Sequence, residues 1–212
     1  MWPDTNETQE LLRQAGEGQA EAVENLLNRH RDSLWRMIRV RLDKGVAQRV
    51  DASDIVQDVL LEASQRLDDY VRDPRMPFHL WLRCMAKDHL LDAHRRHRGA
   101  QRRSVDREQP LVAPAGGDHS EVDLAGQIAD HELTPAAEML RKEMAQRFLQ
   151  ALEQLGEDDR EILLMRHYEQ LSNSEVATAL GLSQPAAGMR YLRAIRRLRT
   201  VIGDPSFLGD VE

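Results

Sequence analysis

Apolar residues recur every three to four positions along most of the chain, which is the pattern of amphipathic helices. Alternation with a period of two, which would indicate strands, is rare, and aromatic residues make up only 4% of the sequence. The pattern predicts helices over residues 7–15, 19–40, 51–67, 78–97, 140–155 and 158–168. We therefore expect an all-α protein.

The helix predicted over residues 51–67 has two clearly different faces. Aspartates and a serine at its start supply N-cap side chains. One face is apolar and is predicted to be buried: Ile55, Val56, Val59, Leu60 and Ala63. The other face carries Asp54, Gln57, Asp58 and Leu61. The helix that follows the break at residues 73–77 buries an apolar stripe of its own: Leu82, Met85, Ala86, Leu90 and Ala93.

The segment from Leu171 onward has the sequence of a helix-turn-helix. Ser172 and Glu175 form an S-x-x-E capping box at the start of a short helix. Gly181 follows that helix, where a tight turn needs a positive φ. Ser183 is the N-cap of the next helix and Pro185 lies in its first turn.

The second helix of this unit, residues 184–199, bears its charge on one side. Ala187, Ala194 and Leu198 recur at helical spacing, with Tyr191 among them, and the other face carries arginines at 190, 193, 196 and 197. A short helix, a sharp turn and an arginine-bearing helix form the arrangement that enters the DNA major groove. DNA is therefore the first partner to consider, although an amphipathic surface helix that does not bind DNA can also carry arginines.

Composition divides the chain into parts. Residues 99–134 lack sustained periodicity and contain two prolines and four glycines, which predicts a linker. We expect a helical domain at 1–98, an acidic linker at 99–135, a helix-turn-helix domain at 136–203 and a loose tail at 204–212. The charge is segregated as well, because residues 83–107 hold eight Lys or Arg against three Asp, whereas 118–132 hold five acids and no Lys or Arg.

The overall charge and residue content exclude several classes of protein. A net charge of −7 argues against a protein that coats DNA without selectivity. A single cysteine, Cys84, excludes an intrachain disulfide and a multi-cysteine zinc site. No signal peptide or membrane span is evident, so we expect a soluble cytoplasmic protein.

An enzyme is the less favoured class. No glycine-rich phosphate loop, Ser-His-Asp arrangement or cofactor fingerprint is present, so no cofactor is expected. A metal-dependent helical hydrolase would use Asp51, Asp54, His94 and His97. Cys84 and His94 are about 15 Å apart along a helix. We therefore expect no metal site.

Two motifs occur in an order that resembles a known family. Residues 54–61, followed by Phe78-His-Leu-Trp-Leu82 and His94-Arg-Arg-His97, resemble region 2 of bacterial RNA polymerase sigma factors. Residues 155–199 resemble region 4 of the same proteins. The chain thus resembles the extracytoplasmic-function (ECF) sigma factors, which implies promoter-specific initiation of transcription together with core RNA polymerase.

The resemblance assigns roles to three sets of residues. It implies docking on the clamp of the polymerase β′ subunit by Asp54, Gln57, Asp58 and Leu61. It implies contacts to the −10 element and its opened strand by Arg75, Trp81, Arg83, Lys87, Arg95 and Arg96. It implies contacts to the −35 element by Gln184, Gly188, Met189, Arg190, Arg193 and Arg197. Arg190 is the leading candidate to read guanine, and Trp81 fits either a packing role or a base contact.

The helix expected to read the −35 element departs from the family pattern. Gln-Pro-Ala-Ala-Gly-Met stands where a run similar to Gly-Thr-Val-Lys-Ser is usual. Gly188 weakens a helix interior by up to about 1 kcal/mol, and a usual lysine is missing. The promoter consensus of relatives therefore does not transfer to this chain.

The resemblance also implies partners. They are core RNA polymerase at its β′ clamp and β flap, promoter DNA and an anti-sigma factor. The acidic linker either enters the RNA channel of the polymerase or serves as a solvated spacer. The alternative function is a helix-turn-helix regulator that acts without polymerase, but that alternative leaves the 54–61 stripe and the basic 78–103 stretch unexplained.

Overall fold

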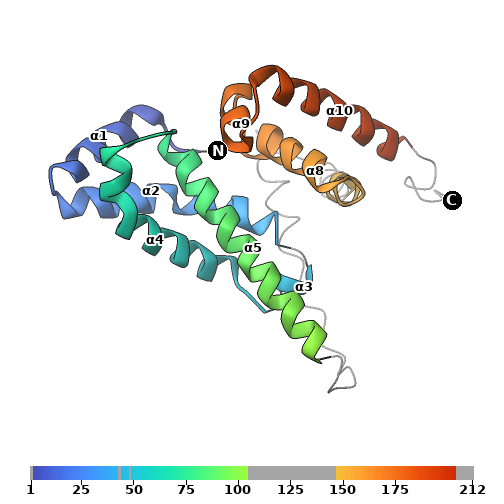
Figure 1. The fold of residues 1–212 in the computed structure, drawn as a ribbon, viewed down its shortest axis with the longest axis horizontal. Coiled ribbons are helices and arrows are strands. Elements are labelled where there is room, and N and C mark those ends of the chain that lie inside the picture. The colour runs from blue at the N-terminus through green and yellow to red at the C-terminus, as the bar shows by residue number, and fades with distance from the viewer. Residues whose placement is uncertain (1, 43, 48, 105–146, 204–212) are drawn as a thin grey trace, which may run out of the picture. The chain divides into compact units, whose positions relative to one another are not determined.

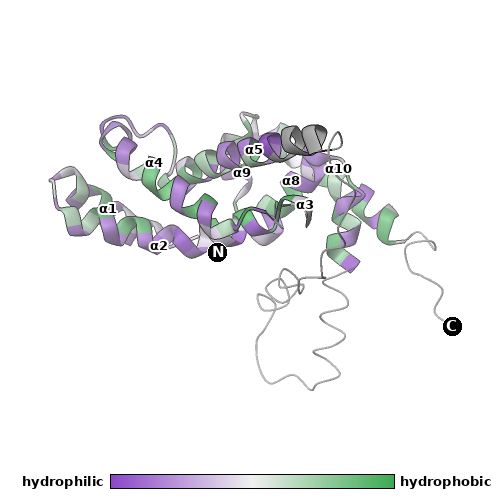
Figure 2. Ribbon diagram, turned by 90° about the horizontal axis from the view of Figure 1, so that it is seen from below, coloured by the Kyte–Doolittle hydropathy of each residue, from purple (hydrophilic) through white to green (hydrophobic). Residues whose placement is uncertain are grey.

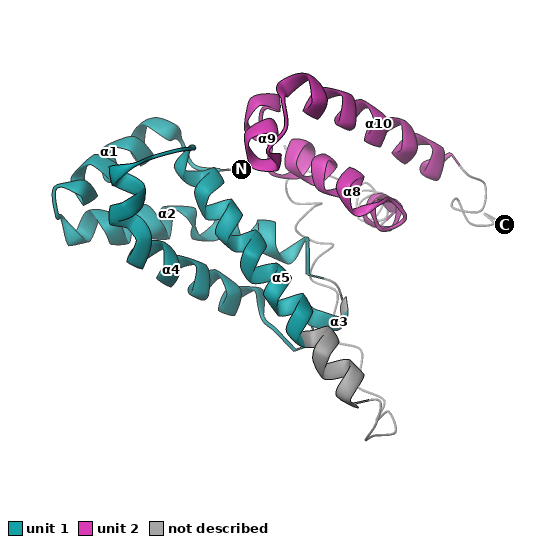
Figure 3. Ribbon diagram, in the orientation of Figure 1, with its two compact units in different colours: residues 1–113 teal, residues 114–212 magenta. Residues whose placement is uncertain are grey.

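The computed structural model describes residues 2–42, 44–47, 49–104 and 147–203, with side chains described for these except Lys44 and residues 97–104. Every regular element within these ranges is helical (Figure 1), which confirms the predicted all-α class. The chain divides into two compact units, Met1–Ala113 and Pro114–Glu212 (Figure 3).

The described part of the first unit is a helical bundle. Its elements are α1 (Thr5–Gly16), α2 (Ala20–Arg39), α3 (Lys44–Ala47), α4 (Ala52–Arg72) and α5 (Phe78–Ser104). Packing is most extensive between α1 and α2, between α2 and α4, and between α4 and α5. The green and purple sides of these helices in Figure 2 show the amphipathic pattern from which they were predicted.

The helix boundaries follow from capping and from local propensity. The Asp51 carboxylate accepts a hydrogen bond of 2.7 Å from the Ser53 N–H, which confirms the predicted start of α4. Both α4 and α5 run past their predicted ends. The residues that lengthen α5 include Ala100, Gln101 and Arg102, which are good helix formers without an apolar stripe, so periodicity alone did not detect them.

The interior of the first unit comes mainly from α2, α4 and α5. The predicted apolar face of α4 is buried throughout, with Val59 and Ala63 at 0% exposed. Leu26, Leu34 and Ile38 from α2 are equally inaccessible. Because one face of α4 is buried in this core, its opposite face remains in solvent.

An aromatic cluster holds the junction between α4 and α5. The ring of Tyr70 lies 5.3 Å from that of Phe78 and 4.7 Å from that of Trp81. His30 from α2 approaches Phe78 edge-on at 5.2 Å. The Tyr70 hydroxyl donates a hydrogen bond of 2.9 Å to the Met76 carbonyl, which anchors the connection between the two helices.

The described part of the second unit contains the predicted helix-turn-helix. A helix over residues 147–153 precedes α8 (Glu157–Leu163), the π-helical turn η1 (Leu164–Tyr168), α9 (Asn173–Leu180) and α10 (Gln184–Ile202). The predicted helix at 140–155 lies partly outside the described residues. The helix predicted over 158–168 corresponds to α8 followed by η1. In η1 the hydrogen bonds change to the i→i+5 pattern, and the Glu169 N–H donates to the Leu164 carbonyl at 2.9 Å.

The turn chemistry of the helix-turn-helix is as predicted. Both hydrogen bonds of the Ser172 and Glu175 capping box are formed. Gly181 has a φ of 63° and ends α9 in the left-handed conformation. The Ser183 hydroxyl then accepts from the Ala186 N–H and caps α10. These local bonds fix the angle at which α10 leaves the turn.

Replacing Gly188 with alanine is expected to raise the free energy of unfolding of the second unit by about 0.5–1 kcal/mol. A Cβ there would meet only Asn173 Oδ1 at 3.9 Å, so the helix gains rigidity without a clash. All three tryptophans lie in the first unit, at 2, 35 and 81, so tryptophan fluorescence reports unfolding of that unit. Urea unfolding of the second unit is measured by the change in circular dichroism that occurs without a change in fluorescence. Gly181→Ala is the matched control and should destabilise, because its φ is 63°. A loss of stability for Gly188→Ala would contradict the expectation.

Candidate nucleic-acid and protein interfaces

The polar face of α4 is an exposed stripe, which we call the α4 stripe: Asp54, Gln57, Asp58 and Leu61. Leu61 is 60% exposed, the largest value among the large apolar residues that are described as exposed. Its neighbours one turn earlier are carboxylate and amide side chains. The α4 stripe can therefore offer hydrogen bonds to basic groups around one apolar anchor.

A polar bridge beside the α4 stripe ties α4 to α5. Glu62 accepts a hydrogen bond of 2.6 Å from Arg66 and lies 2.8 Å from the His89 ring nitrogen. Bonds from Arg66 and then His89 lower the pKa of the Glu62 carboxyl below its usual value. This bridge adds to the apolar packing that holds the stripe on a rigid helix.

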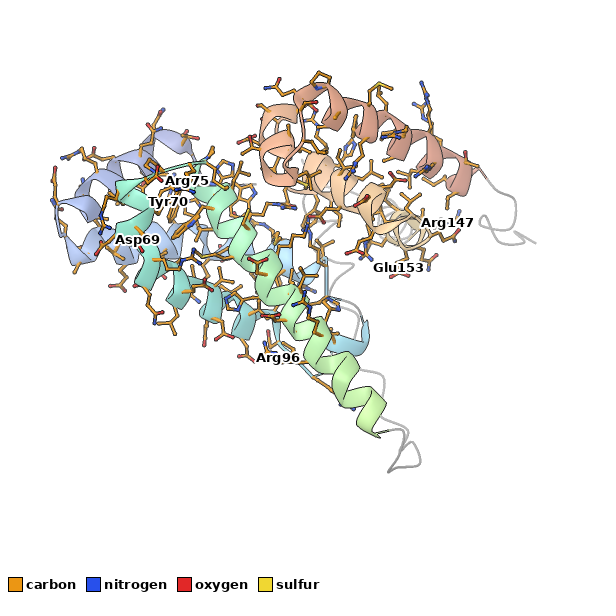
Figure 4. The ribbon with its side chains drawn as sticks, in the orientation of Figure 1. Asp69, Tyr70, Arg75, Arg96, Arg147 and Glu153 are labelled. Carbon is orange, nitrogen blue, oxygen red and sulfur yellow. The ribbon has the colours of Figure 1, made fainter. Side chains whose placement is uncertain are left out.

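Most of the basic residues predicted to meet the −10 element are on the surface. Lys87 and Arg95 are exposed on α5, as is Arg96, whereas Arg75 lies in the connection before α5 (Figure 4). Arg75 pairs with Asp73 at 2.8 Å and Arg95 with Asp92 at 3.3 Å. Such exposed pairs contribute only about 0–1 kcal/mol, so phosphate can displace the carboxylates.

Arg83 requires a correction. It is 1% exposed, so in this structure its guanidinium is not available to DNA. The reason is its place on α5, one turn after Leu80 and two turns before Leu90, both of which are buried. An arginine within the buried arc of a helix is held in the interior. It is therefore removed from the candidate DNA contacts.

Trp81 packs within the aromatic cluster. Its ring lies 4.7 Å from that of Tyr70 and 5.5 Å from that of Phe78, and the residue is partly exposed. The structure thus shows the packing role that the sequence left open. A base contact by the exposed part of the ring stays a prediction.

The residues predicted to meet the −35 element fall into two groups on α10. Gln184, Met189 and Arg193 are exposed, whereas Gly188 is half-buried. Arg190, by contrast, has a side chain only 28% exposed and lies 3.6 Å from Asp158 of α8. Arg193 is therefore better exposed for base contact than the leading candidate Arg190.

Arg197 is tied to α8 in the same way. It forms an ion pair with Asp159, whose side chain is 7% exposed. The first turn of α8 and three arginines of α10 line an open groove of about 610 Å³: Gly156, Glu157, Asp158, Asp159, Arg190, Arg193 and Arg197. The ion pairs orient Arg190 and Arg197 toward α8. Sequence spacing does not indicate this feature, because Asp159 and Arg197 are 38 positions apart.

Two sequence alternatives can be compared with the described residues. Among these residues, no group of three or more His, Cys, Asp or Glu side chains is placed to hold a metal ion. Two residues considered for a metal site from the sequence are Asp51 and Cys84. Asp51 caps α4, and burial raises the pKa of the Cys84 thiol. His97 lies outside the described side chains. Nor does the described part of the chain include a helix that is long and apolar enough to cross a membrane.

Comparison with family models identifies both units. Residues 26–100 match the model described as sigma-70 region 2, and residues 145–198 match that described as sigma-70, region 4. Together the two models cover more than half of the chain. The first match contains α4 and most of α5, and the second contains α8, α9 and most of α10.

Two named sigma factors are similar to this chain over most of its length. The RNA polymerase sigma factor CnrH of Cupriavidus metallidurans is 29% identical over 192 residues, covering 91% of this chain and 92% of that protein. The ECF sigma factor SigL of Mycobacterium tuberculosis is 28% identical over 194 residues, covering 91% and 96%.

Solved structures show the same fold. CnrH in complex with the cytosolic domain of CnrY has a TM-score of 0.58 at 23% identity, covering 92% of this chain and 97% of that one. The sigma factor RpoE of Bartonella quintana, in complex with the anti-sigma factor NepR, has a TM-score of 0.50 at 21% identity, covering 81% and 91%. The fold is thus shared with proteins whose sequences are only 21–23% identical to this chain.

Proposed function

The chain belongs to the ECF sigma factors of bacterial RNA polymerase, and from this premise we propose how its surfaces act. It binds core polymerase and directs initiation at promoters that carry its −35 and −10 elements. Region 2 docks on the polymerase and keeps the −10 strand open, and region 4 reads the −35 element. Sigma factors are generally not enzymes, and the chemistry of RNA synthesis belongs to the core polymerase.

The observation that carries the proposal is the α4 stripe. Asp54 and Asp58 are exposed on a helix whose other face is fixed in the core, and Leu61 is 60% exposed between polar neighbours. Leu61 ends the α4 stripe one turn after Gln57 and Asp58, so the three side chains lie on one face of the helix. Acidic groups around one apolar anchor suit a basic partner surface, and we assign the β′ clamp as that partner.

The second contact is with the −10 element. Lys87, Arg95 and Arg96 are exposed on α5, and Arg75 lies near its start. Because separated strands have lost their stacking, the protein must hold them through phosphate contacts and aromatic surfaces. We propose that these four cations grip the backbone and that Trp81 supplies the aromatic edge, without a contribution from Arg83.

The third contact is with the −35 element. α10 has five arginines and no acidic residue over Gln184–Ile202, which suits a polyanion. Its first half holds Gln184, Met189 and Arg193 at the surface. We assign base contacts to this half, because residues near the start of a recognition helix reach base edges. Arg190 and Arg197 contribute through their pairs with α8.

Regulation by a protein is the natural extension. The two solved relatives were each obtained with a protein partner, the cytosolic domain of CnrY for one and the anti-sigma factor NepR for the other. We propose that this chain is likewise held inactive by an anti-sigma factor. Core polymerase and promoter DNA are in the bacterial cytoplasm, and the proposed function places the chain there.

In vitro transcription with purified bacterial core polymerase is the test of the function. A library of randomised promoters should yield transcripts that depend on the added chain and share −35 and −10 sequences. Core enzyme alone is the control. A chain that binds duplex DNA but neither binds core polymerase nor starts transcription would be a helix-turn-helix regulator instead, and the proposal would be wrong.

A further inference from the structure

The first half of α10 has two exposed large apolar side chains, which we call the α10 apolar pair: Met189, 55% exposed, and Leu192, 47% exposed. They are one helical turn apart and so lie on the same face. The core-facing residues Ala187, Ala194 and Leu198 point the other way, at 0%, 0% and 7% exposed. The α10 apolar pair therefore lies outside the buried core of its own unit.

The surroundings of the α10 apolar pair are cationic. Arg193 and Arg196 are exposed beside it, and the whole of α10 has no acidic residue. Gly188 precedes Met189, and its missing side chain leaves the pair unscreened on that flank. An apolar patch beside exposed arginines, on a helix without acidic residues, suits an anionic partner that carries small apolar groups. The major groove of DNA is such a partner, because the 5-methyl groups of thymine project between phosphate backbones.

The position along the helix supports the same partner. Met189 and Leu192 are the sixth and ninth residues of α10, within the half that reaches base edges in helix-turn-helix proteins. Their Cα atoms are separated by about 4.5 Å along the helix axis. Neighbouring base pairs are about 3.4 Å apart, so the two side chains can cover consecutive base pairs.

We propose that Met189 and Leu192 read thymine methyl groups in the −35 element. The inference rests on the proposed function and deepens it, because it names the chemical group that sets part of the promoter specificity. Leu192 is thereby added to the −35 residues as a specificity determinant. The usual family pattern has a polar run at Gly188 and Met189, so this readout is a property of the chain's own residues.

The test compares thymine with uracil, which lacks only the methyl group. A −35 element is first selected from randomised promoter DNA by the wild-type holoenzyme, and each thymine is then replaced singly by deoxyuridine. At one or two positions we expect a loss of affinity of about fourfold, the equivalent of one buried methyl group. Holoenzyme that carries Leu192→Ala or Met189→Ala should bind the selected promoter less tightly. It should also no longer distinguish thymine from uracil at the base pair that the replaced side chain contacts.

Ile202→Ala is the matched control, because Ile202 is 39% exposed at the far end of the same helix and should leave the discrimination unchanged. The inference is overturned if the selected element has no thymine, if deoxyuridine changes nothing, or if the variants still discriminate. It is also overturned if the variants lose affinity for core polymerase without DNA, which would make the pair a polymerase contact. Failure of the proposed function is distinct, since no holoenzyme would then form and no promoter would be selected.

Discussion

Replacing Asp54 and Asp58 together with lysine is expected to weaken binding to core RNA polymerase by about 100-fold or more. Both side chains are exposed on α4 and are assigned to a basic surface of the β′ clamp. The double variant places like charges against that surface, which costs several kcal/mol. Transcription from the selected promoters should fall to the level of core polymerase alone. The measurement is a titration of labelled protein with core enzyme, followed by in vitro transcription.

The fold should survive this substitution. Neither aspartate is buried, and only Asp54 lies in the first turn of α4, where losing its interaction with the helix dipole costs about 0.3–1 kcal/mol. Glu21→Lys with Glu24→Lys is the matched control, because it makes the same charge change with one residue in the first turn of α2. The control should bind core polymerase normally. Equal loss in both double variants would show a general charge effect and would remove the assignment of the α4 stripe.

The features that could be predicted from sequence are those that local chemistry determines. The Asp51 cap, the Ser172 and Glu175 capping box and the positive φ of Gly181 each depend on a few adjacent residues. The buried face of α4 follows from a regular apolar period, which also predicts which residues lie on its exposed face. The exposure of Asp54 and Asp58 was thus accessible from the sequence alone.

The features that were missed depend on contacts between distant residues. The sequence shows Arg83 as one of several basic residues on α5, and only its packing beneath the first unit's surface reveals that it is 1% exposed. The pair of Asp159 and Arg197 joins α8 to α10 across 38 positions. Arg190 is the leading candidate from sequence because arginine can bond to guanine with two hydrogen bonds, and its contact with Asp158 of α8 cannot be inferred from spacing. The periodicity of apolar residues predicts which of them are buried. It does not predict whether the charged group of a long side chain is buried, paired or exposed.

His30 illustrates a further long-range feature, because its environment comes from three separate segments. It is 1% exposed, and its ring lies 6.1 Å from that of Trp2 and 5.2 Å from that of Phe78. The Thr8 hydroxyl donates to the Asp4 carbonyl at 2.8 Å, so its oxygen can only accept from His30 Nε2, which lies 3.5 Å away. Nδ1 is then the bare ring nitrogen, and it has no hydrogen-bond partner among the described residues.

Burial, followed by electrostatic interaction with His79 and Arg29, lowers the pKa of His30 from 6.5 to about 4. The unfolded chain therefore takes up a proton at a higher pH than the folded one. Stability is fully present above pH 6.5 and declines as the pH falls from 6.5 toward 4. At pH 5 the first unit should have lost about 2 kcal/mol of its free energy of unfolding, since one pKa unit corresponds to about 1.4 kcal/mol.

Urea unfolding at pH 7.5 and pH 5, followed by tryptophan fluorescence, measures this loss for the first unit alone, because it holds all three tryptophans. His30→Leu should remove most of the difference between the two pH values, since leucine fills the pocket without titrating. His94→Leu, at a partly exposed position on α5, is the control and should keep the difference. If His30→Leu loses as much stability at pH 5 as the wild type, protonation of other groups governs the acid response.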